Sequence, residues 1–281
     1  MFHASQHRKL WQRVLLICSL SSLIACSTNT ALHYNQSSNS SDLKRIVLVG
    51  DSTMATKSGY GDALCAQLKV NVECINLARG GRSSGSFRAE GLWNQVEQIL
   101  RNQGERRTWV LIQFGHNDQP GKPGRSTDLV TEFPVNMARY VDEVRAWGGI
   151  PVLVTPLTRR SFRDGVLENN LLPWAQAIEK IAAEKKVMLL PLNAESYAAV
   201  QAMGEAEADT LAVAPPPSNS SASQAQNIGA NNPATIEPQG TPKSAFDRTH
   251  VGTKGAKFFS TMVLHQLISV APEWRSSLQA Q

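Results

Sequence analysis

The segment Ile46-Val47-Leu48-Val49-Gly50-Asp51-Ser52-Thr53 joins four apolar residues to three short polar side chains. A run of four apolar residues, three of them β-branched, is typical of a strand that is buried on both faces. Open α/β sheets bind their ligands at the carboxyl ends of such strands. Ser52 could therefore be a nucleophile at the edge of a sheet. Alternatively, the polar residues could only turn the chain and cap the next helix.

Apolar segments of strand length alternate with segments of helical periodicity along the rest of the chain. Strands are predicted at 45–49, 72–77, 109–114, 150–155 and 187–190. Helices are predicted at 60–68, around 92–100, and at 133–144, 171–186, 194–211 and 251–270. This alternation predicts a parallel sheet that is covered by helices on both faces.

Residues 1–25 have the pattern of a secretory signal rather than of a folded domain. Basic residues open it, and an apolar run of about a dozen residues follows, which is too short to span a bilayer stably. Its end, Leu23-Ile24-Ala25-Cys26, resembles the processing box of bacterial lipoproteins, in which Cys26 would carry lipid. A buried helix, or a plain signal with a chance cysteine, is the alternative. Because Ser27 follows the cysteine, the resemblance favours a lipid-anchored protein of the bacterial cell envelope, held at the outer membrane.

The composition of the mature chain gives further expectations about its organisation. Removal of the signal takes away three of the 28 basic residues, which leaves 25 basic and 23 acidic residues. This near balance gives no indication of nucleic-acid binding. Residues 26–42 are rich in Ser and Asn and predict a flexible tether, and 43–275 predict one domain. Within that domain, 215–243 is rich in Pro, Ser, Asn, Gln and Ala and predicts a disordered surface insertion.

Two cysteines, Cys65 and Cys74, belong to the predicted domain and stand nine positions apart. In an oxidising compartment they could form a disulfide, or they could be buried as small apolar residues. No Cys-x-x-Cys or His-x-x-x-His pairing indicates a metal site, and no cofactor is expected.

Two histidines of the mature chain lie in segments that could carry chemistry. Asp247 precedes His250 by three residues, just before the last predicted helix. A carboxylate at that spacing can orient an imidazole and stabilise its protonated form. His116 lies beside Asn117 at the end of the third predicted strand, where uncharged donors suit the stabilisation of an oxyanion. Both patterns also occur in ordinary turns and helix starts.

A second serine lies in a motif of its own, Gly81-Arg82-Ser83-Ser84-Gly85, which satisfies the Gly-x-Ser-x-Gly pattern of the nucleophile elbow. That elbow requires an immediate strand-to-helix turn after several strands. Only two predicted strands precede Ser83, and the next helical periodicity begins several residues later. We therefore reject Ser83 as the nucleophile.

Four motifs occur in the order in which the SGNH (GDSL-type) hydrolases carry them. They are Gly50-Asp51-Ser52, the turn at Gly81, Gly115-His116-Asn117-Asp118 and Asp247-x-x-His250. The chain resembles this family from about residue 46 to 259. Longer matches at 76–84, 112–119 and 155–160 look like the rhamnogalacturonan acetylesterase branch.

This resemblance implies the fold and the reacting groups. The implied fold is a three-layer α/β/α, flavodoxin-like fold with a five-stranded parallel sheet in the order 2-1-3-4-5. The implied nucleophile is Ser52, and the implied base is His250, oriented by Asp247. The backbone N–H groups of Ser52 and Gly81, with the side chain of Asn117, would form the oxyanion hole.

Two basic residues on the loop after the fourth predicted strand, Arg159 and Arg160, could bind a substrate. Their guanidinium groups could contact uronate carboxylates, or they could simply be solvated. We expect a serine esterase that removes O-acetyl groups from a polysaccharide, with the pectic polymer rhamnogalacturonan as the first candidate.

Other readings keep the fold but change the function. The same chemistry could act on peptidoglycan, on another acetylated glycan or on a lipid ester. The chain could also be a catalytically inactive, carbohydrate-binding lipoprotein. The expected partners are an acetylated polysaccharide and, through the lipid, a membrane, but no nucleic acid.

Overall fold

The computed structural model describes residues 43–216 and 246–279. The predicted signal at 1–25, Cys26 and the tether at 26–42 lie outside the described residues, as do residues 217–243 of the predicted insertion. Over the part of the chain that is described, no helix has the length and apolar character needed to cross a membrane.

Five parallel strands form the central sheet. They are β1 (Lys44–Gly50), β2 (Glu73–Asn76), β3 (Arg107–Gln113), β4 (Ile150–Val154) and β7 (Met188–Leu190). Their order across the sheet is β2-β1-β3-β4-β7, with every neighbouring pair parallel. Because β7 is the fifth strand of this sheet along the chain, the predicted order 2-1-3-4-5 is confirmed.

The apolar run in β1 has a simple structural cause. Successive side chains of a strand point to opposite faces of the sheet. Ile46 and Leu48 pack into the core on one face, whereas Val47 and Val49 pack into the core on the other. All four are completely buried. Because both faces of the sheet are covered, each of these four residues must be apolar, whichever face it points to. This is why the strand has the unbroken apolar run from which the sheet was predicted.

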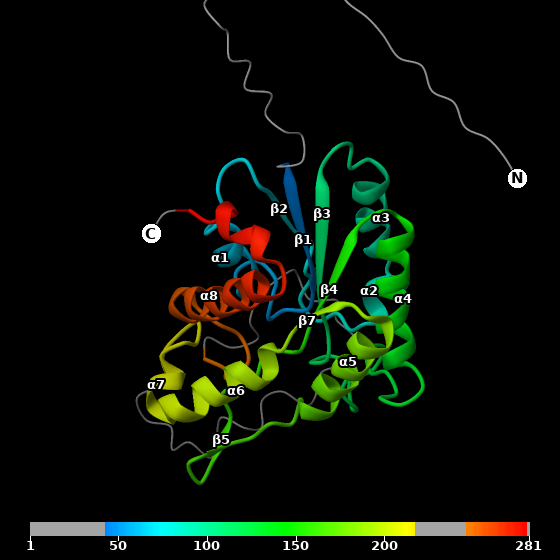
Figure 1. Cartoon of the computed structure of the whole chain (residues 1–281). Helices are drawn as coiled ribbons and strands as arrows, with labels where there is room; N and C mark the ends of the chain where they lie inside the picture. Colours follow the sequence, from blue (N-terminus) through cyan, green and yellow to red (C-terminus); the bar gives the residue numbers. More distant parts are fainter. Residues whose placement is uncertain (1–42, 217–245, 280–281) are drawn as a thin grey trace, which may run out of the picture. The chain divides into compact units, whose positions relative to one another are not determined.

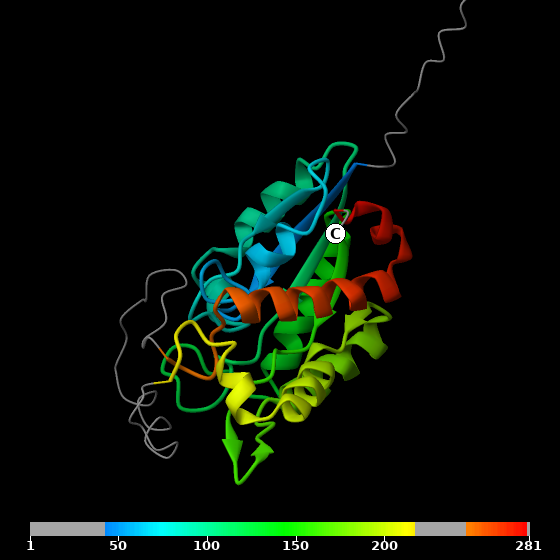
Figure 2. The same cartoon turned by 90° about the vertical axis from the view of Figure 1, so that its left-hand side faces the viewer.

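Helices cover the two faces of the sheet in separate layers (Figure 1). One layer contains α3 (Trp93–Arg101), α4 (Phe133–Ala146) and α5 (Leu172–Lys185). The other contains α1 (Gly61–Cys65), α6 (Leu192–Met203) and α8 (Thr253–Val270). Figure 2 shows α8, in orange, crossing this face in contact with α1 and α6. The three-layer α/β/α fold is therefore confirmed.

The predicted helix at 194–211 is wrong as a single element. It is divided at Gly204, whose φ of 77° lies in the left-handed region that favours glycine. A second, short helix, α7 (Glu205–Asp209), follows. The direction of the chain therefore changes between α6 and α7, which apolar spacing alone does not indicate.

Several short elements were not predicted, because they are too short to show a periodicity. They are α2 (Ser86–Ala89), the antiparallel hairpin of β5 (Phe162–Arg163) and β6 (Val166–Leu167), and the 3-10 helix η2 (Pro272–Ser277). In η2, Trp274 is completely buried and meets Trp109 of β3 edge to face, with ring centroids 5.0 Å apart. This contact closes one end of the core.

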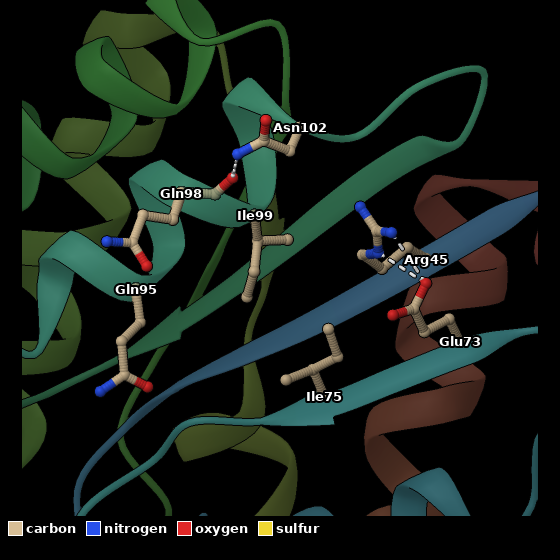
Figure 3. Close-up of a pocket in the computed structure, with 7 residues that line it drawn as sticks. All are labelled: Arg45, Glu73, Ile75, Gln95, Gln98, Ile99 and Asn102. Carbon is tan, nitrogen blue, oxygen red and sulfur yellow. Dashed lines mark hydrogen bonds and ion pairs between the residues drawn. The ribbon is translucent and has the colours of Figure 1, made fainter.

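A groove of about 450 Å³ lies beside β2 and α3 (Figure 3). It is formed by Arg45, Glu73, Ile75, Gln95, Gln98, Ile99 and Asn102. Arg45 and Glu73 stand at the amino ends of their strands and form an ion pair at 2.8 Å. The groove is therefore at the opposite end of the sheet from the predicted site. The charges of Arg45 and Glu73 within it are paired with each other.

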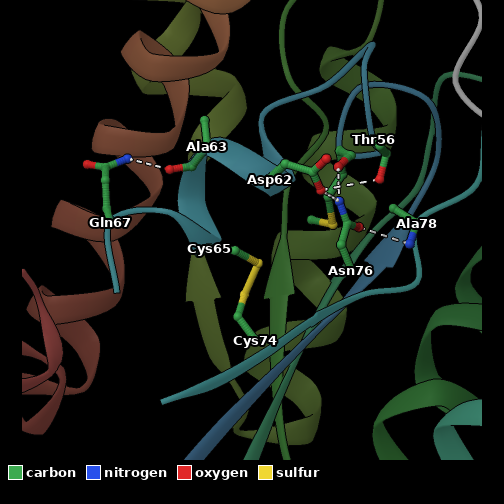
Figure 4. Close-up of a disulfide and its surroundings, with 9 residues drawn as sticks. Thr56, Asp62, Ala63, Cys65, Gln67, Cys74, Asn76 and Ala78 are labelled. Carbon is green, nitrogen blue, oxygen red and sulfur yellow. Dashed lines mark hydrogen bonds between the residues drawn. A yellow bond between two sulfur atoms is a disulfide. The ribbon is translucent and has the colours of Figure 1, made fainter. Parts of the chain in front are cut away.

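Cys65 and Cys74 form a disulfide, which resolves the choice that the sequence left open (Figure 4). The bond joins the last residue of α1 to β2. Close by, the side-chain amide of Asn76 donates to the carbonyl oxygen of Met54 at 3.1 Å and to Asp62 at 2.8 Å. The disulfide and these bonds together attach the segment after β1 to the edge strand.

Candidate active site

The polar segments predicted to form a site begin at one edge of the sheet. Gly50, the last residue of β1, pairs in register with Gln113, the last residue of β3. The N–H of Arg79, in the loop after β2, donates to the carbonyl oxygen of Gly50 at 2.9 Å. Ser52, Asn117 and the glycine turn after β2 therefore leave the sheet from adjacent strand ends.

The turn after β1 is held by a buried polar network. The N–H and the hydroxyl of Thr53 both donate to Asp51 Oδ1, at 2.9 and 2.8 Å. Gln113 Nε2 donates to Thr53 Oγ1 at 2.7 Å, and the hydroxyl of Tyr60 donates to Gln113 Oε1 at 2.8 Å. All four side chains are completely buried. Ser52 is thus fixed between two anchored neighbours rather than carried on a loose loop.

Two backbone N–H groups predicted to line an oxyanion hole are available for a ligand. Within the described residues, neither Ser52 N–H nor Gly81 N–H has a hydrogen-bond acceptor. The φ of Gly81 is 77°, a conformation that a residue with a side chain rarely adopts. Ser52 itself is nearly buried, with 9% of its surface exposed.

Asn117 is oriented by the same turn. Its Nδ2 donates one hydrogen to the carbonyl oxygen of Arg82 at 3.1 Å. A side-chain amide nitrogen carries two hydrogens, so the second remains available to a ligand. The bond to Arg82, the residue after Gly81, joins the Asn117 segment to the glycine turn.

Asp247 and His250 form a close carboxylate–imidazole pair before α8. His250 Nδ1 lies 3.0 Å from Asp247 Oδ2, while Asp247 Oδ1 accepts from the N–H groups of Thr249 and His250. Burial alone would raise the pKa of Asp247, but the bonds from the side chain and backbone of His250 outweigh it and hold the pKa below its usual value. The carboxylate is therefore ionised at neutral pH, and the pairing at Nδ1 leaves Nε2 of His250 to accept a proton.

Arg160 does not face solvent, so the structure gives no support to a contact with substrate. It is completely buried, and its Nη2 donates to the carbonyl oxygens of Asp247 and His250 at 2.9 and 2.7 Å. Its own N–H donates to the carbonyl oxygen of Arg248 at 2.8 Å. Arg160 therefore holds the segment that carries His250.

Arg159, the neighbouring candidate, is placed differently. It is half-buried, and its Nη1 donates to Asn170 Oδ1 at 2.6 Å. Burial lowers its pKa, although the negative charge of Asp51 acts in the opposite direction. Its guanidinium is thus close enough to the site to interact with Asp51.

The sequence analysis missed a second carboxylate–imidazole pair. His116 Nδ1 lies 3.2 Å from Asp51 Oδ2, and both side chains are almost completely buried. Burial lowers the pKa of His116, although Asp51 opposes this effect. Burial would raise the pKa of Asp51, but His116 and Thr53 outweigh it and lower that pKa. Because both pKa values are lowered, His116 is a neutral imidazole beside the ionised carboxylate of Asp51. The sequence placed Asp51 directly after β1 and His116 three residues after β3, but it did not show that these two strands are neighbours in register.

Asp118 ties the loop after β3 to the glycine turn. Its Oδ1 accepts from the N–H and hydroxyl of Ser84, at 3.0 and 2.6 Å, and from the hydroxyl of Thr127 at 2.8 Å. Burial raises the pKa of Asp118 to about 6, although these hydrogen bonds oppose the shift. Asp118, the residue after Asn117, therefore joins the loop after β3 to Ser84, three residues after Gly81.

Ser83 lies where an attacking group could not reach a substrate. It is completely buried, and its Oγ accepts from the N–H of Ser86 at 3.1 Å at the start of α2. Its position agrees with its rejection as a nucleophile. Across residues 43–216 and 246–279, no cluster of three His, Cys, Asp or Glu side chains could hold a metal ion.

Comparison with known proteins identifies similar sequences and folds. The model of the GDSL-like lipase/acylhydrolase family matches residues 48–214, which include Ser52, Gly81 and Asn117. The rhamnogalacturonan acetylesterase RhgT of Bacillus subtilis (strain 168) is 31% identical over 227 residues, which cover 78% of this chain and 87% of the relative. The probable rhamnogalacturonan acetylesterase YesY of the same organism is 34% identical over 167 residues, 57% of this chain and 75% of the relative.

A solved structure shares the fold. Axe2, an acetyl-xylooligosaccharide esterase from Geobacillus stearothermophilus, aligns with a TM-score of 0.54 over 84% of this chain and 97% of its own. The two sequences are 14% identical. At that identity the likeness concerns the arrangement of the sheet and its helices.

Proposed function

Because the chain belongs to the GDSL-like lipase/acylhydrolase family and is a carboxylic ester hydrolase, we propose that it removes O-acetyl groups from rhamnogalacturonan. The observation that carries the proposal is the similarity to RhgT, a protein that is named a rhamnogalacturonan acetylesterase. This similarity extends over most of both chains. The close pairing of Asp247 with His250 supports the same chemistry, in which we assign Ser52 as the nucleophile.

In the first half of the reaction, Ser52 Oγ attacks the carbonyl carbon of the acetyl ester. His250 accepts the hydroxyl proton at Nε2, because its Nδ1 is engaged by Asp247 at 3.0 Å. The negative charge that develops on the carbonyl oxygen is stabilised by three donors: the N–H groups of Ser52 and Gly81 and the second Nδ2 hydrogen of Asn117.

The tetrahedral intermediate then collapses in the direction of the acyl-enzyme. The bond between the carbonyl carbon and the sugar oxygen breaks, and the sugar hydroxyl leaves with the proton from His250. Water attacks the acetyl-Ser52 ester with the same base and the same oxyanion donors. Acetate and free Ser52 are the products, so no cofactor is required for the balance of the reaction.

Acetate release from a set of acetylated polymers tests the proposal. The set contains acetylated rhamnogalacturonan, acetylxylan and O-acetylated peptidoglycan, each assayed with the wild type and with Ser52→Ala. We expect the highest kcat/KM on rhamnogalacturonan and no release by the variant. A higher kcat/KM on another polymer would replace rhamnogalacturonan as the substrate. Binding without hydrolysis of any ester would favour a carbohydrate-binding lipoprotein.

We also propose that the protein is attached to the bacterial cell envelope through lipid on Cys26. The support is the order of basic, apolar and small residues before that cysteine. Two acyl chains on one N-terminus hold a protein much more firmly than one, since each buried CH₂ contributes about 0.8 kcal/mol. Cys26→Ser should abolish labelling with a radioactive fatty acid. Unchanged labelling in this variant would exclude Cys26 as the attachment site.

A further inference from the structure

Three basic side chains stand beside the oxyanion donors without a carboxylate of their own. Lys122 and Arg125 belong to the loop after β3, Arg159 belongs to the loop after β4, and all three are half-buried. None of them forms an ion pair within the described residues, whereas nine other arginines there do. The fold itself therefore does not account for these charges.

Direct contacts place the two residues of the β3 loop next to the site. Lys122 Nζ donates to the carbonyl oxygen of His116, the residue before Asn117, at 2.5 Å. Arg125 Nη1 lies 3.3 Å from the point that a Cβ on Gly81 would occupy. One cation thus adjoins the Asn117 segment, and the other adjoins the glycine turn.

Asn170 joins Arg159 to the same loop. Arg159 Nη1 donates to Asn170 Oδ1 at 2.6 Å, and Gln119 Nε2 donates to the carbonyl oxygen of Asn170 at 2.9 Å. Arg159 is therefore linked through Asn170 to the segment that carries Lys122.

The carboxylates nearest to these cations have other partners. Asp51 accepts from Thr53 and contacts His116, and Asp118 accepts from Ser84 and Thr127. Burial, together with the positive charges of Arg159 and Arg125, lowers the pKa of Lys122 to about 8. Like charges held close together without neutralisation destabilise the free protein, and a bound anion would relieve this repulsion.

Ester hydrolysis does not explain the cluster, because the proposed oxyanion donors are neutral N–H groups. We propose that Lys122, Arg125 and Arg159 form a subsite for a uronate carboxylate of the glycan, next to the acetylated sugar. This inference rests on the proposed function, and it names the feature of the polymer that the enzyme recognises. Guanidinium groups suit this ligand, since their planar donors match the two oxygens of a carboxylate.

Calorimetric binding tests the subsite without requiring hydrolysis. The probes are an oligogalacturonate and a neutral galacto-oligosaccharide of the same length. We expect the wild type to bind the oligogalacturonate and to bind the neutral probe at least about tenfold more weakly. Because the three cations are only half-buried, binding of the acidic probe should weaken as the salt concentration rises.

Arg125→Gln is the principal variant, since within the described residues no side chain accepts a hydrogen bond from Arg125. It should weaken oligogalacturonate binding roughly tenfold and leave binding of the neutral probe within about twofold. Arg159→Gln should have the same effect, although it also removes the bond to Asn170. The matched control is Arg139→Gln on α4, where the arginine is 64% exposed and pairs with Glu143 at 2.7 Å. It should leave both affinities unchanged.

The outcomes separate the subsite from the proposed function. Equal wild-type affinity for the acidic and neutral probes would overturn the subsite, as would an Arg125→Gln variant with unchanged oligogalacturonate affinity. Either result is compatible with normal acetate release from rhamnogalacturonan. Selective binding of the oligogalacturonate that depends on Arg125 would support the subsite. This support would stand even if the acetate-release assay identified a different acidic polymer as the substrate.

Discussion

Arg160 Nη2 donates to the carbonyl oxygen of His250 at 2.7 Å, so the proposed base is held by a residue ninety positions earlier in the chain. The same nitrogen donates to the carbonyl oxygen of Asp247 at 2.9 Å. A second arginine also restrains this segment, because Arg248 donates to Asp209 of α7 at 3.0 Å. The position of the Asp–His pair is therefore fixed through its backbone as well as through its own side chains.

We expect Arg160→Gln to lower kcat at least about tenfold with little change in KM, because small displacements of a catalytic group can cost up to about a hundredfold in rate. Arg160→Lys should recover part of the loss, since it can still donate to one carbonyl oxygen. Steady-state kinetics on a small acetyl ester measures both. Arg145→Gln is the control, because Arg145 also donates to two backbone carbonyl oxygens, those of Lys185 and Lys186, but far along α4. Equal kinetic losses in Arg160→Gln and Arg145→Gln would indicate a general effect on stability.

The two serine motifs predict opposite results. Ser52→Ala should abolish hydrolysis of a small acetyl ester, whereas Ser83→Ala should retain most of it. Ser83→Ala should instead lower the free energy of unfolding by about 1 kcal/mol, because Ser83 Oγ accepts the N–H of Ser86 at the start of α2. Near-total loss of activity in a folded Ser83→Ala variant, with activity retained in Ser52→Ala, would transfer the nucleophile to the second motif.

Asn117→Ala should lower kcat roughly 100- to 1,000-fold and change KM much less, because the lost hydrogen bond strengthens only as the oxyanion forms. The control is Asn102→Ala in the groove at the opposite end of the sheet (Figure 3). There Asn102 Nδ2 donates to the carbonyl oxygen of Gln98 at 2.8 Å, so a similar bond is lost away from the site. An effect of Asn117→Ala confined to KM would assign this residue to ground-state binding.

Features that depend on local patterns were predictable from the sequence, and β1 is the clearest case. Its apolar run, its glycine and its polar residues are adjacent in the chain, so the strand and the position of Ser52 at its carboxyl end followed directly. The spacing of Asp247 and His250 likewise indicated their pairing. The break at Gly204 was missed, because one glycine within an apolar periodicity also occurs inside continuous helices.

Features that depend on distant contacts were not predictable in the same way. Arg160 had the same local signal as Arg159, and only the packing of the Asp247 segment shows that one is buried while the other is half-exposed. The Asp51–His116 pair required the register of β1 and β3 to be known. The disulfide required the distance between α1 and β2, which the spacing of two cysteines does not contain.

Asp118 should give the stability a characteristic pH dependence. Its pKa is 3.8 in the unfolded chain and about 6 in the folded one, so between these values the folded state binds more protons. Its contribution to the free energy of unfolding is therefore greatest below about pH 4 and is lost as the pH rises through about 6. The difference between wild type and Asp118→Asn should fall by up to about 3 kcal/mol across this range, measured by urea unfolding.

The opposite sign is expected for an exposed carboxylate. Hydrogen bonds from Thr131 and Val130 hold the pKa of Asp128 below 3.8. Asp128 therefore contributes stability above that pH, and the contribution is lost as the pH falls further. The difference in the free energy of unfolding between wild type and Asp128→Asn should thus decrease on acidification.

For Asp118, a difference between wild type and Asp118→Asn that does not vary from pH 4 to 7 would show that the pKa of Asp118 is not raised in the folded protein.

The disulfide should contribute measurably to the stability of the fold (Figure 4). A bond that closes a loop between residues nine positions apart should stabilise the protein by about 2–3 kcal/mol, largely by restricting the unfolded chain. The double variant Cys65→Ser/Cys74→Ser should therefore unfold at a Tm about 5–10 °C lower in calorimetry. The wild type in reductant should approach the same Tm, whereas the double variant should not respond to reductant. Because Asn76 and Asp62 still hold α1 and the segment after β1 in place, kcat on a small ester at 25 °C should fall less than about threefold. A loss of kcat as large as that of Asn117→Ala would instead show that the disulfide, and not the hydrogen bonds around it, positions Ser52.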